Sequence, residues 1–424
     1  MQTGPVTKQE KVVLVLPGAG ANNAIQGMMS EFGRALAAHG LNTVHITFDP
    51  SELKYAVDLM AAGNVSFALT WLGIGQDISV TDQNGTELNA WDALHVPLVK
   101  IHADHPAYFS DRHRDSPKSS VNLYMAAEFM EFRHRWLPNE RALTGVVPPW
   151  PIAPLARSDV NLGKRRNGKL VFLKNGNSPR ALQRLWRERL TPAVAELLGT
   201  MAHDIVPIGL RPGKLLIGDF VAHFIERRGV EPDSAAPLMP FFTAQLDDYL
   251  RRIKSEMIAT AILDFPVIVQ GDAWEHVDFS GRRAHLVPGE DFVASRRVFA
   301  DELGVIDMSP NMDSEPHDRM QRGAGSYSLV LSNKQSWIGS EFPGFDDLTF
   351  EFEPDSIKAR IADVLAHPDR YLELGVAFGE RFRDVHPMEA FSGRVVELAE
   401  VAALHCSAEK PQLQPFFAWP AGNH

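Results

Sequence analysis

The sequence predicts an α/β protein made of two doubly wound domains with parallel sheets, and three observations support this fold class. Residues 11–16 form a continuous run of β-branched residues and leucine, typical of a strand that is buried on both faces. A stretch with helical apolar spacing and a second strand follow within fifty residues, which makes a β–α–β unit. The same alternation resumes beyond residue 169, after a proline-rich stretch, and 424 residues are enough for two such domains.

In the first domain, residues 25–38 are the first predicted helix, because their apolar residues recur at helical spacing. Gly40 stands where the carboxyl end of a helix favours glycine. The run "LNTVHITFD" is the second strand, parallel to the first. Further elements are expected as strands at residues 65–73 and 96–104 and as a helix at residues 119–136.

The second domain opens with a predicted strand at residues 169–179, and long amphipathic helices follow at 180–199 and 238–261. The α/β alternation then resumes, with a short helix from about His317 and a strand at "SLVLSN". We therefore place the first domain at 1–152, a linker at 153–168, the second domain at 169–400 and a tail at 401–424. The sequence leaves open whether this tail packs back on the first domain or hangs free.

Composition and charge narrow the classes of partner. With 42 Lys and Arg against 53 Asp and Glu, the formal net charge is −11, which disfavours nucleic acid as a partner. A single cysteine, Cys406, excludes an internal disulfide and a cysteine-clustered zinc site. The chain shows no apolar leader and no long apolar run, so we expect a cytoplasmic protein. Peripheral contact with a membrane through "PFFAWP" and the oligomeric state stay open.

Ligands of open parallel sheets bind at the carboxyl ends of the strands, so the turns after the predicted strands are the candidate sites. The first turn holds Gly18, Gly20 and Asn22, whose small size lets a ligand approach the backbone, although a plain strand-to-helix turn explains them as well. The second turn holds Asp104 and His105, a pair suited to take a proton from a hydroxyl group. The alternatives for this pair are a histidine that caps a helix or belongs to a polar network, and a His/Asp metal site.

The third turn holds Lys174 and Asn175, where the lysine suits a phosphate as a point charge, and a surface lysine is the alternative. The fourth turn follows a predicted strand that ends in Ser309, Pro310 and Asn311.

Beyond Asn311, His317, Asp318 and Arg319 stand at the start of a predicted helix. Free N–H groups at that helix start, together with Arg319, would bind a diphosphate. The competing interpretation is an ordinary capped helix in which Arg319 pairs with Glu315.

This last segment resembles bacterial glycosyltransferases of the GT-B architecture, in the branch of the glycosyl transferases group 1 and spore-maturation-protein-like enzymes. The resemblance rests on His317-Asp318-Arg319 at the helix start, Gly323-Ala324-Gly325 in the helix and the following strand "LVLSN". The run "FPVIVQGDAW" is similar to the strand that leads to the nucleotide base, and "PLVKIHADHPAYF" to the strand on the acceptor side. The resemblance covers most of the second half of the chain and touches the first.

The resemblance implies two Rossmann-like domains that face each other across a cleft, and transfer of a sugar from a nucleotide-diphosphate donor to a glycan, protein or small-molecule acceptor. It implies a role in bacterial glycan biosynthesis, with the nucleotide-sugar as co-substrate and no cofactor. The base and ribose would lie at Gly271 and Trp274. No Asp-x-Asp pair ends a strand, so we expect no metal and assign charge stabilisation to Lys174, Arg319 and the helix start.

One departure concerns the mechanism. Retaining members of the family carry a glutamate on this helix, at the position that Arg322 occupies here. Inversion through a base at Asp104 or His105 is therefore at least as plausible. Two other classes stay open: a nucleotide-sugar epimerase or hydrolase of the same fold, and a non-catalytic protein that binds sugar nucleotides or glycans.

Overall fold

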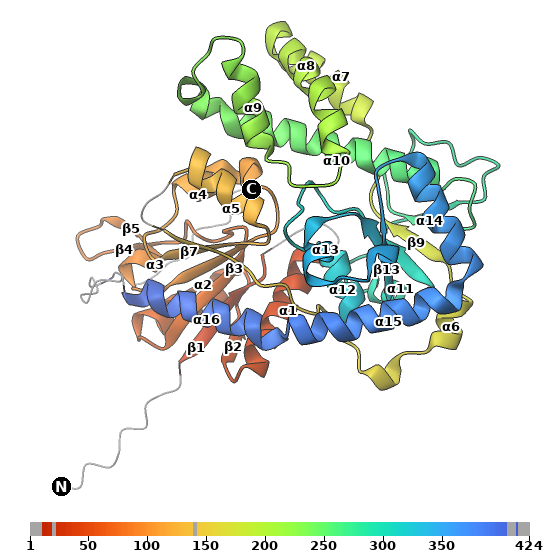
Figure 1. The fold of residues 1–424 in the computed structure, drawn as a ribbon. Helices are drawn as coiled ribbons and strands as arrows, with labels where there is room; N and C mark the ends of the chain where they lie inside the picture. Colours follow the sequence, from red (N-terminus) through yellow and green to blue (C-terminus); the bar gives the residue numbers. More distant parts are fainter. Residues whose placement is uncertain (1–10, 19–22, 139–141, 405–412, 414–424) are drawn as a thin grey trace.

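The computed structural model describes residues 11–18, 23–138, 142–404 and 413. Two parallel sheets, each covered by helices on both faces, lie side by side, and a group of helices projects above them (Figure 1). Each sheet has six strands and pairs entirely in parallel. This confirms the predicted fold class of two doubly wound, Rossmann-like domains.

The first sheet has the strand order β2-β1-β3-β6-β7-β8. Its central strands are buried on both faces, as the apolar run of β1 predicts, with Val13 and Leu14 fully buried. The strands are β1 (Val12–Leu16), β2 (Asn42–His45), β3 (Val65–Trp71), β6 (Leu98–His102), β7 (Ser120–Tyr124) and β8 (Leu143–Val146). The helices of this half are α1 (Ala24–Ala38), α2 (Pro50–Ala61), α3 (Ala90–Ala93), α4 (Ser110–Arg114) and α5 (Ala127–Trp136), and a hairpin of β4 (Ser79–Thr81) and β5 (Glu87–Asn89) lies beside the sheet.

The helix predicted over residues 119–136 is half wrong, because its first part is strand β7 and only its second part is helix α5. Ala126 between them has extended backbone. β7 contains polar residues that are nevertheless buried, since Asn122 Oδ1 lies 2.9 Å from His102 Nε2 on the neighbouring strand. A buried strand with polar positions does not show the continuous apolar run that identifies β1.

The second sheet has the order β11-β10-β9-β12-β13-β14. Its strands are β9 (Leu170–Leu173), β10 (Ile268–Gln270), β11 (His285–Val287), β12 (Gly304–Ile306), β13 (Leu329–Asn333) and β14 (Thr349–Phe350). The helices packed on it are α6 (Leu162–Arg166), α11 (Arg296–Asp301), α12 (Asp318–Gly325), α13 (Ser336–Glu341), α14 (Pro354–Ala366) and α15 (Pro368–Val385). The sheet and these helices share one large apolar core.

Four helices inserted between β9 and β10 form the projection at the top of Figure 1. They are α7 (Pro179–Arg189), α8 (Pro192–Gly209), α9 (Ile217–Glu226) and α10 (Met239–Ala261). Pro192 begins a new helix, which divides the predicted helix at 180–199 in two. The insertion has its own apolar core, and Phe132 and Trp136 of α5 belong to that core. The insertion therefore rests on the first domain as well as on the second.

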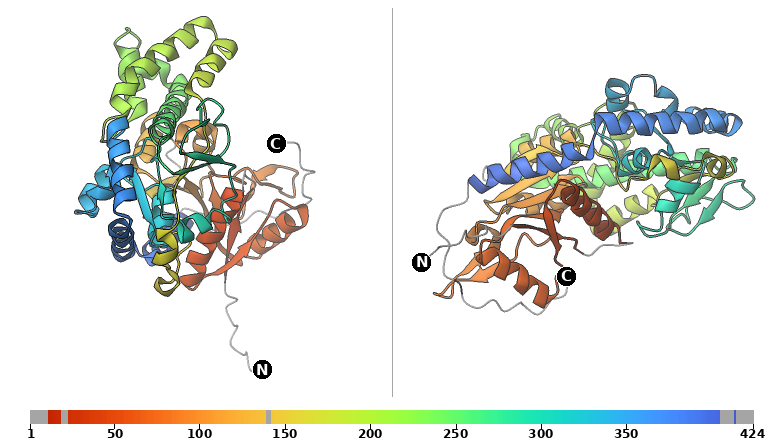
Figure 2. Two further views of the ribbon diagram at one scale, coloured as in Figure 1. Left: turned by 90° about the vertical axis from the view of Figure 1, so that its right-hand side faces the viewer. Right: turned by 90° about the horizontal axis from the view of Figure 1, so that it is seen from below.

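Two segments cross between the halves (Figures 1 and 2). The final helix α16 (Met388–Leu404) returns to the first domain, where Phe391 stacks on Trp150 with ring centroids 4.3 Å apart. Residues 162–166, which the sequence assigns to the linker, form α6, and Arg165 donates from there to four backbone carbonyls of the second domain. In the tail, the described residue Leu413 forms a β-bridge with Asp82 of the first domain. Within the described ranges, none of the helices has the length and apolarity that crossing a bilayer requires.

Candidate functional site

The loops at the carboxyl ends of the two sheets touch each other. Glu128, on α5 of the first domain, accepts hydrogen bonds from the backbone N–H groups of Asp313 (2.9 Å) and Ser314 (3.0 Å) in the second domain. Ser314 Oγ also donates to Glu128 and accepts from the N–H of Ala127 at 3.2 Å, which caps the start of α5. This reciprocal contact fixes the loop after β12 against the first domain, and the predicted site residues lie around that junction.

A chain of charges organises the start of α12. Asp307, at the end of β12, is buried, and its Oδ1 lies 3.1 Å from His317 Nδ1 and 3.2 Å from Arg319 Nη1. His317 Nε2 lies 2.9 Å from Asp318 Oδ1. Burial opposes the charge on His317, but Asp318 and Asp307 outweigh it and raise the pKa of this imidazole. Arg319 thus pairs with Asp307, and the pairing with Glu315 does not occur.

The helix start is left with backbone donors and a neighbouring ammonium group. The N-cap residue His317 makes no side-chain hydrogen bond to the first turn of α12, so its first N–H groups are not capped by that residue. Lys174, at the end of β9, is partly buried. Burial and the positive charges of Arg319 and Arg251 lower the pKa of Lys174 to about 7, against the opposite effect of Asp307 and Asp318. An anion at this place would supply the negative charge that the lysine lacks.

Asn175 has a different role from the one predicted. Its side chain accepts from the backbone N–H of Asp272 at 3.0 Å, which braces the turn after β9 against the turn after β10. It thereby supports the position of Lys174, its neighbour in the chain.

Helix α10 of the insertion contributes residues that sequence reasoning missed. Arg251 Nε lies 3.0 Å from Asp247 Oδ2, and Arg251 Nη1 lies 3.7 Å from Asp104 Oδ1 of the first domain. The fully buried Asp247 also accepts from Tyr108 Oη at 2.7 Å and from Asn311 Nδ2 at 2.9 Å. Arg251 is therefore the cation that joins Asp104 to the charge cluster around Lys174.

Asp104 and His105 differ in what they offer. The Asp104 side chain is 42 % exposed, so its carboxylate is open to solvent. His105 is 5 % exposed, and its Nδ1 accepts from the backbone N–H of Ala107 at 3.2 Å, at the start of the 3₁₀ turn Pro106–Phe109. Burial lowers the pKa of His105 to about 4, so the ring is neutral and carries its hydrogen on Nε2. A base needs a free imidazole lone pair, and His105 has committed its own to this cap.

A cavity of about 800 Å³ opens beside β10 and β11, with Gly271 and Trp274 among its lining residues. Trp274 is only 1 % exposed, and its Nε1 donates to the backbone carbonyl of Lys174 at 2.9 Å. The indole thus supports the turn after β9 and leaves little of its face for stacking. A Cβ at position 271 would lie 2.1 Å from the Lys174 carbonyl oxygen, so this position requires glycine.

Three further sequence observations have plain structural outcomes. Gly18 has a positive φ of 63° after β1, a conformation that glycine adopts without strain. Gly20 and Asn22 lie outside the described residues. Arg322 is buried, its guanidinium lies over the Phe292 and Phe299 rings at 4.2 and 4.5 Å, and it donates to the Phe292 carbonyl at 3.0 Å. It packs the two domains together, because Phe292 belongs to the apolar core of the first domain.

Among the residues that the structure describes, no group of three or more His, Cys, Asp or Glu side chains is arranged to hold a metal ion.

No protein-family model matches the sequence, and a search of curated proteins finds no relative. Solved structures of similar shape include T4 phage β-glucosyltransferase in complex with UDP and Mn²⁺ (8% identity, 93% of this chain, 99% of that chain, TM-score 0.49). They also include sucrose-phosphate synthase from Thermosynechococcus elongatus (11%, 93%, 100%, 0.46) and a glycosyltransferase from Rickettsia africae (9%, 93%, 98%, 0.44). At such identities and TM-scores, nothing about the activity of this chain follows from them.

The topology of the chain itself decides the fold. Two parallel six-stranded sheets, each in a Rossmann-like layering, meet through the loops at their carboxyl ends. This is the GT-B fold. The family resemblance of the sequence predicted this arrangement of domains, and the structure confirms it.

Proposed function

We propose that the protein transfers a glycosyl group from a nucleoside diphosphate sugar, bound by the second domain, to a hydroxyl group of an acceptor. One observation carries the proposal: Arg251 lies 3.7 Å from the open carboxylate of Asp104 and also belongs to the cationic cluster around Lys174. A candidate base and a candidate diphosphate site are thus linked through Arg251, although they come from different domains.

The chemistry follows from the two groups. Asp104 accepts the proton of the acceptor hydroxyl while that oxygen attacks the anomeric carbon of the donor sugar. The bond between the anomeric carbon and the diphosphate oxygen breaks, and the nucleoside diphosphate leaves with the electron pair. Lys174, Arg319 and the uncapped N–H groups of α12 stabilise the negative charge on the leaving group. A single displacement of this kind inverts the anomeric centre.

These cations lead us to propose that the transfer needs no divalent metal ion. EDTA at millimolar concentration is expected to leave the rate within twofold of the untreated enzyme. A loss that Mg²⁺ or Mn²⁺ restores would refute this part of the proposal.

The first experiment is a calorimetric and thermal-shift screen against UDP, GDP, CMP, dTDP and their sugars. A ligand at 100 times its Kd raises the apparent stability by about 2.7 kcal/mol, so even weak donors register. Arg319→Ala should abolish the response, whereas Arg282→Ala, which removes an exposed arginine of the same domain, should not. The absence of any response in the folded wild type would refute the donor site.

Turnover then distinguishes the classes of function. Release of nucleoside diphosphate that depends on an added acceptor supports the transferase. Turnover of the sugar nucleotide in the absence of acceptor identifies a hydrolase or epimerase. Binding with no turnover under any condition, unchanged by Asp104→Asn, identifies a binding protein.

A further inference from the structure

A cavity lies between α5 of the first domain and the connection from α8 to α9 in the insertion. Its volume is about 240 Å³, far above the roughly 10–15 Å³ that a single water molecule needs. Its wall includes His105, Phe132, Trp136, Leu216, Gly218 and Asn311. The space suits a group the size of one sugar ring and is too small for a long chain.

The floor of the cavity carries an unused hydrogen-bond donor. Nδ1 of His105 accepts from Ala107, so the Nε2–H group is the remaining polar atom of this neutral ring. No described residue accepts that hydrogen. His105 is only 5 % exposed, and it lines the cavity. A ligand oxygen in the cavity would accept this hydrogen.

Two other polar residues of the lining, Asn311 and Glu128, are occupied by contacts within the protein. Asn311 donates from Nδ2 to Asp247 and accepts at Oδ1 from Lys254 Nζ at 2.8 Å. Glu128, which also lines the cavity, accepts from the loop at Asp313 and Ser314. Two donors of the lining are therefore open to an oxygen atom of the ligand: His105 Nε2, and Trp136 Nε1, which is buried and has no hydrogen-bond partner among the described residues.

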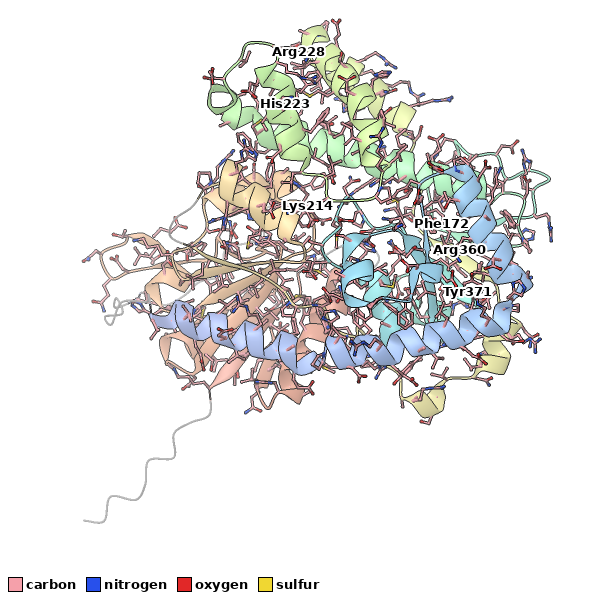
Figure 3. All side chains as sticks on the ribbon, in the orientation of Figure 1. Phe172, Lys214, His223, Arg228, Arg360 and Tyr371 are labelled. Carbon is pink, nitrogen blue, oxygen red and sulfur yellow. The ribbon has the colours of Figure 1, made fainter. Side chains whose placement is uncertain are left out.

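Two ion pairs tie the insertion to α5 at the cavity. Arg135 lies 2.6 Å from Asp219, and Glu131 lies 2.5 Å from Lys214, which Figure 3 labels below the projecting helices. Each pair joins a residue of α5 to a residue of the α8–α9 connection or the first turn of α9. The walls between them are apolar, from Phe132, Trp136 and the leucines. Apolar walls with a polar floor and a charged rim match a sugar ring, which has apolar faces and hydroxyl groups at its edge.

We infer that this cavity is a binding site for one sugar ring of the acceptor, with His105 Nε2 donating to a ring hydroxyl. The inference rests on the proposed function, because the neighbour of His105 in the chain is Asp104, the proposed base. His105 is a positioning residue: its hydrogen bond brings the acceptor hydroxyl to Asp104, and its own proton stays in place. The insertion completes the site, so the choice of acceptor is set by the α8–α9 connection.

The test uses saturation-transfer NMR with the methyl glycosides of glucose, mannose and N-acetylglucosamine at millimolar concentration. Wild type is expected to bind at least one of them. Leu216→Trp, which fills the cavity, and His105→Asn should each reduce that signal at least fivefold. Asparagine is a favoured capping residue, so it keeps the bond to Ala107 and removes only the distal donor. Leu238→Trp, at an exposed leucine of the insertion, is the matched control and should bind as wild type does.

Nucleotide binding, measured on the same samples, separates the two proposals. Retained nucleotide binding with lost glycoside binding in the variants supports the acceptor site. No glycoside signal in wild type, or an equal signal in Leu216→Trp, would overturn it whatever the nucleotide result. In the transfer reaction, His105→Asn should raise the acceptor KM and leave the pH profile of kcat unchanged, whereas loss of a limb of that profile would show that His105 is a base.

Discussion

We predict that Lys174 makes the affinity for the proposed donor depend on pH. Burial, Arg319 and Arg251 lower its pKa to about 7 in the free protein. A bound diphosphate favours the ammonium form and raises this pKa, so binding takes up a proton at any pH above 7. The donor Kd should then rise tenfold for each pH unit above 7. Between pH 6 and pH 9 the loss is about a hundredfold, or about 2.7 kcal/mol.

The free protein should show the opposite trend. Because the pKa of Lys174 is lower when folded, the unfolded chain binds more protons between pH 7 and the ordinary lysine value of 10.5. The contribution of Lys174 to the free energy of unfolding therefore increases with pH across that window. Saturating donor should remove this contribution, since the bound lysine keeps its proton.

Isothermal titration calorimetry at half-unit steps from pH 6 to pH 9, in buffers of different ionisation enthalpy, measures both the Kd and the proton uptake. Lys174→Met is the matched variant, since it keeps the length of the side chain and has no charge to lose. Its Kd at pH 6 should be close to that of wild type at pH 9. His317 also loses its positive charge as the pH rises. Lys174→Met keeps His317, so the difference in slope between wild type and the variant is the contribution of the lysine. A wild-type Kd that is flat from pH 7 to pH 9, or an equal slope in Lys174→Met, would refute the reasoning.

Three other predictions concern the cleft. Asp104→Asn should lower the transfer rate by about 10² to 10⁴ and leave the donor Kd unchanged in calorimetry; a loss below tenfold would exclude a base there. Glu128→Ala removes the acceptor of two backbone N–H groups and of the Ser314 hydroxyl, so urea unfolding should show a loss of about 2–4 kcal/mol, and Glu128→Gln a smaller one. Gly271→Ala puts a methyl group against the Lys174 carbonyl, and we expect about 1–3 kcal/mol of destabilisation with weaker donor binding; unchanged thermal stability would contradict the steric argument.

The parts of the fold that the sequence predicted are those with a strong local signal. β1, α1 and β2 follow from a buried apolar run, helical spacing and a glycine at the helix end, and all three are present. β7 was missed because its burial rests on polar partners across the sheet, which no local pattern encodes. α9 was also missed, although Ile217, Val221, Phe224 and Ile225 stand at helical spacing in the sequence and are all buried in the structure.

The residues of the candidate site likewise include some that the sequence predicts and others that only the fold shows. Lys174 and the start of α12 follow strands directly, and the rule that parallel strands end at one edge predicts that they lie together. Asp247 and Arg251 are four residues apart on a helix, a spacing that is usual for solvent-exposed ion pairs. Only the fold shows that this pair is buried between the domains. The cap that occupies His105 is likewise set by the turn at Pro106, which the sequence contains but whose hydrogen bond it does not specify.

The position of Asp247 limits how the cleft can move. Its carboxylate, fully buried on α10, accepts from Tyr108 of the first domain and from Asn311 of the second, and pairs with Arg251. A rotation that opened the domains would break one of these contacts and leave a buried charge with fewer partners, at a cost of several kcal/mol. The buried packing of Arg322 between the halves adds to this resistance. The spacing between Asp104 and the proposed diphosphate site is therefore held by α10. We expect a bound donor to change the loops at the strand ends more than the angle between the domains.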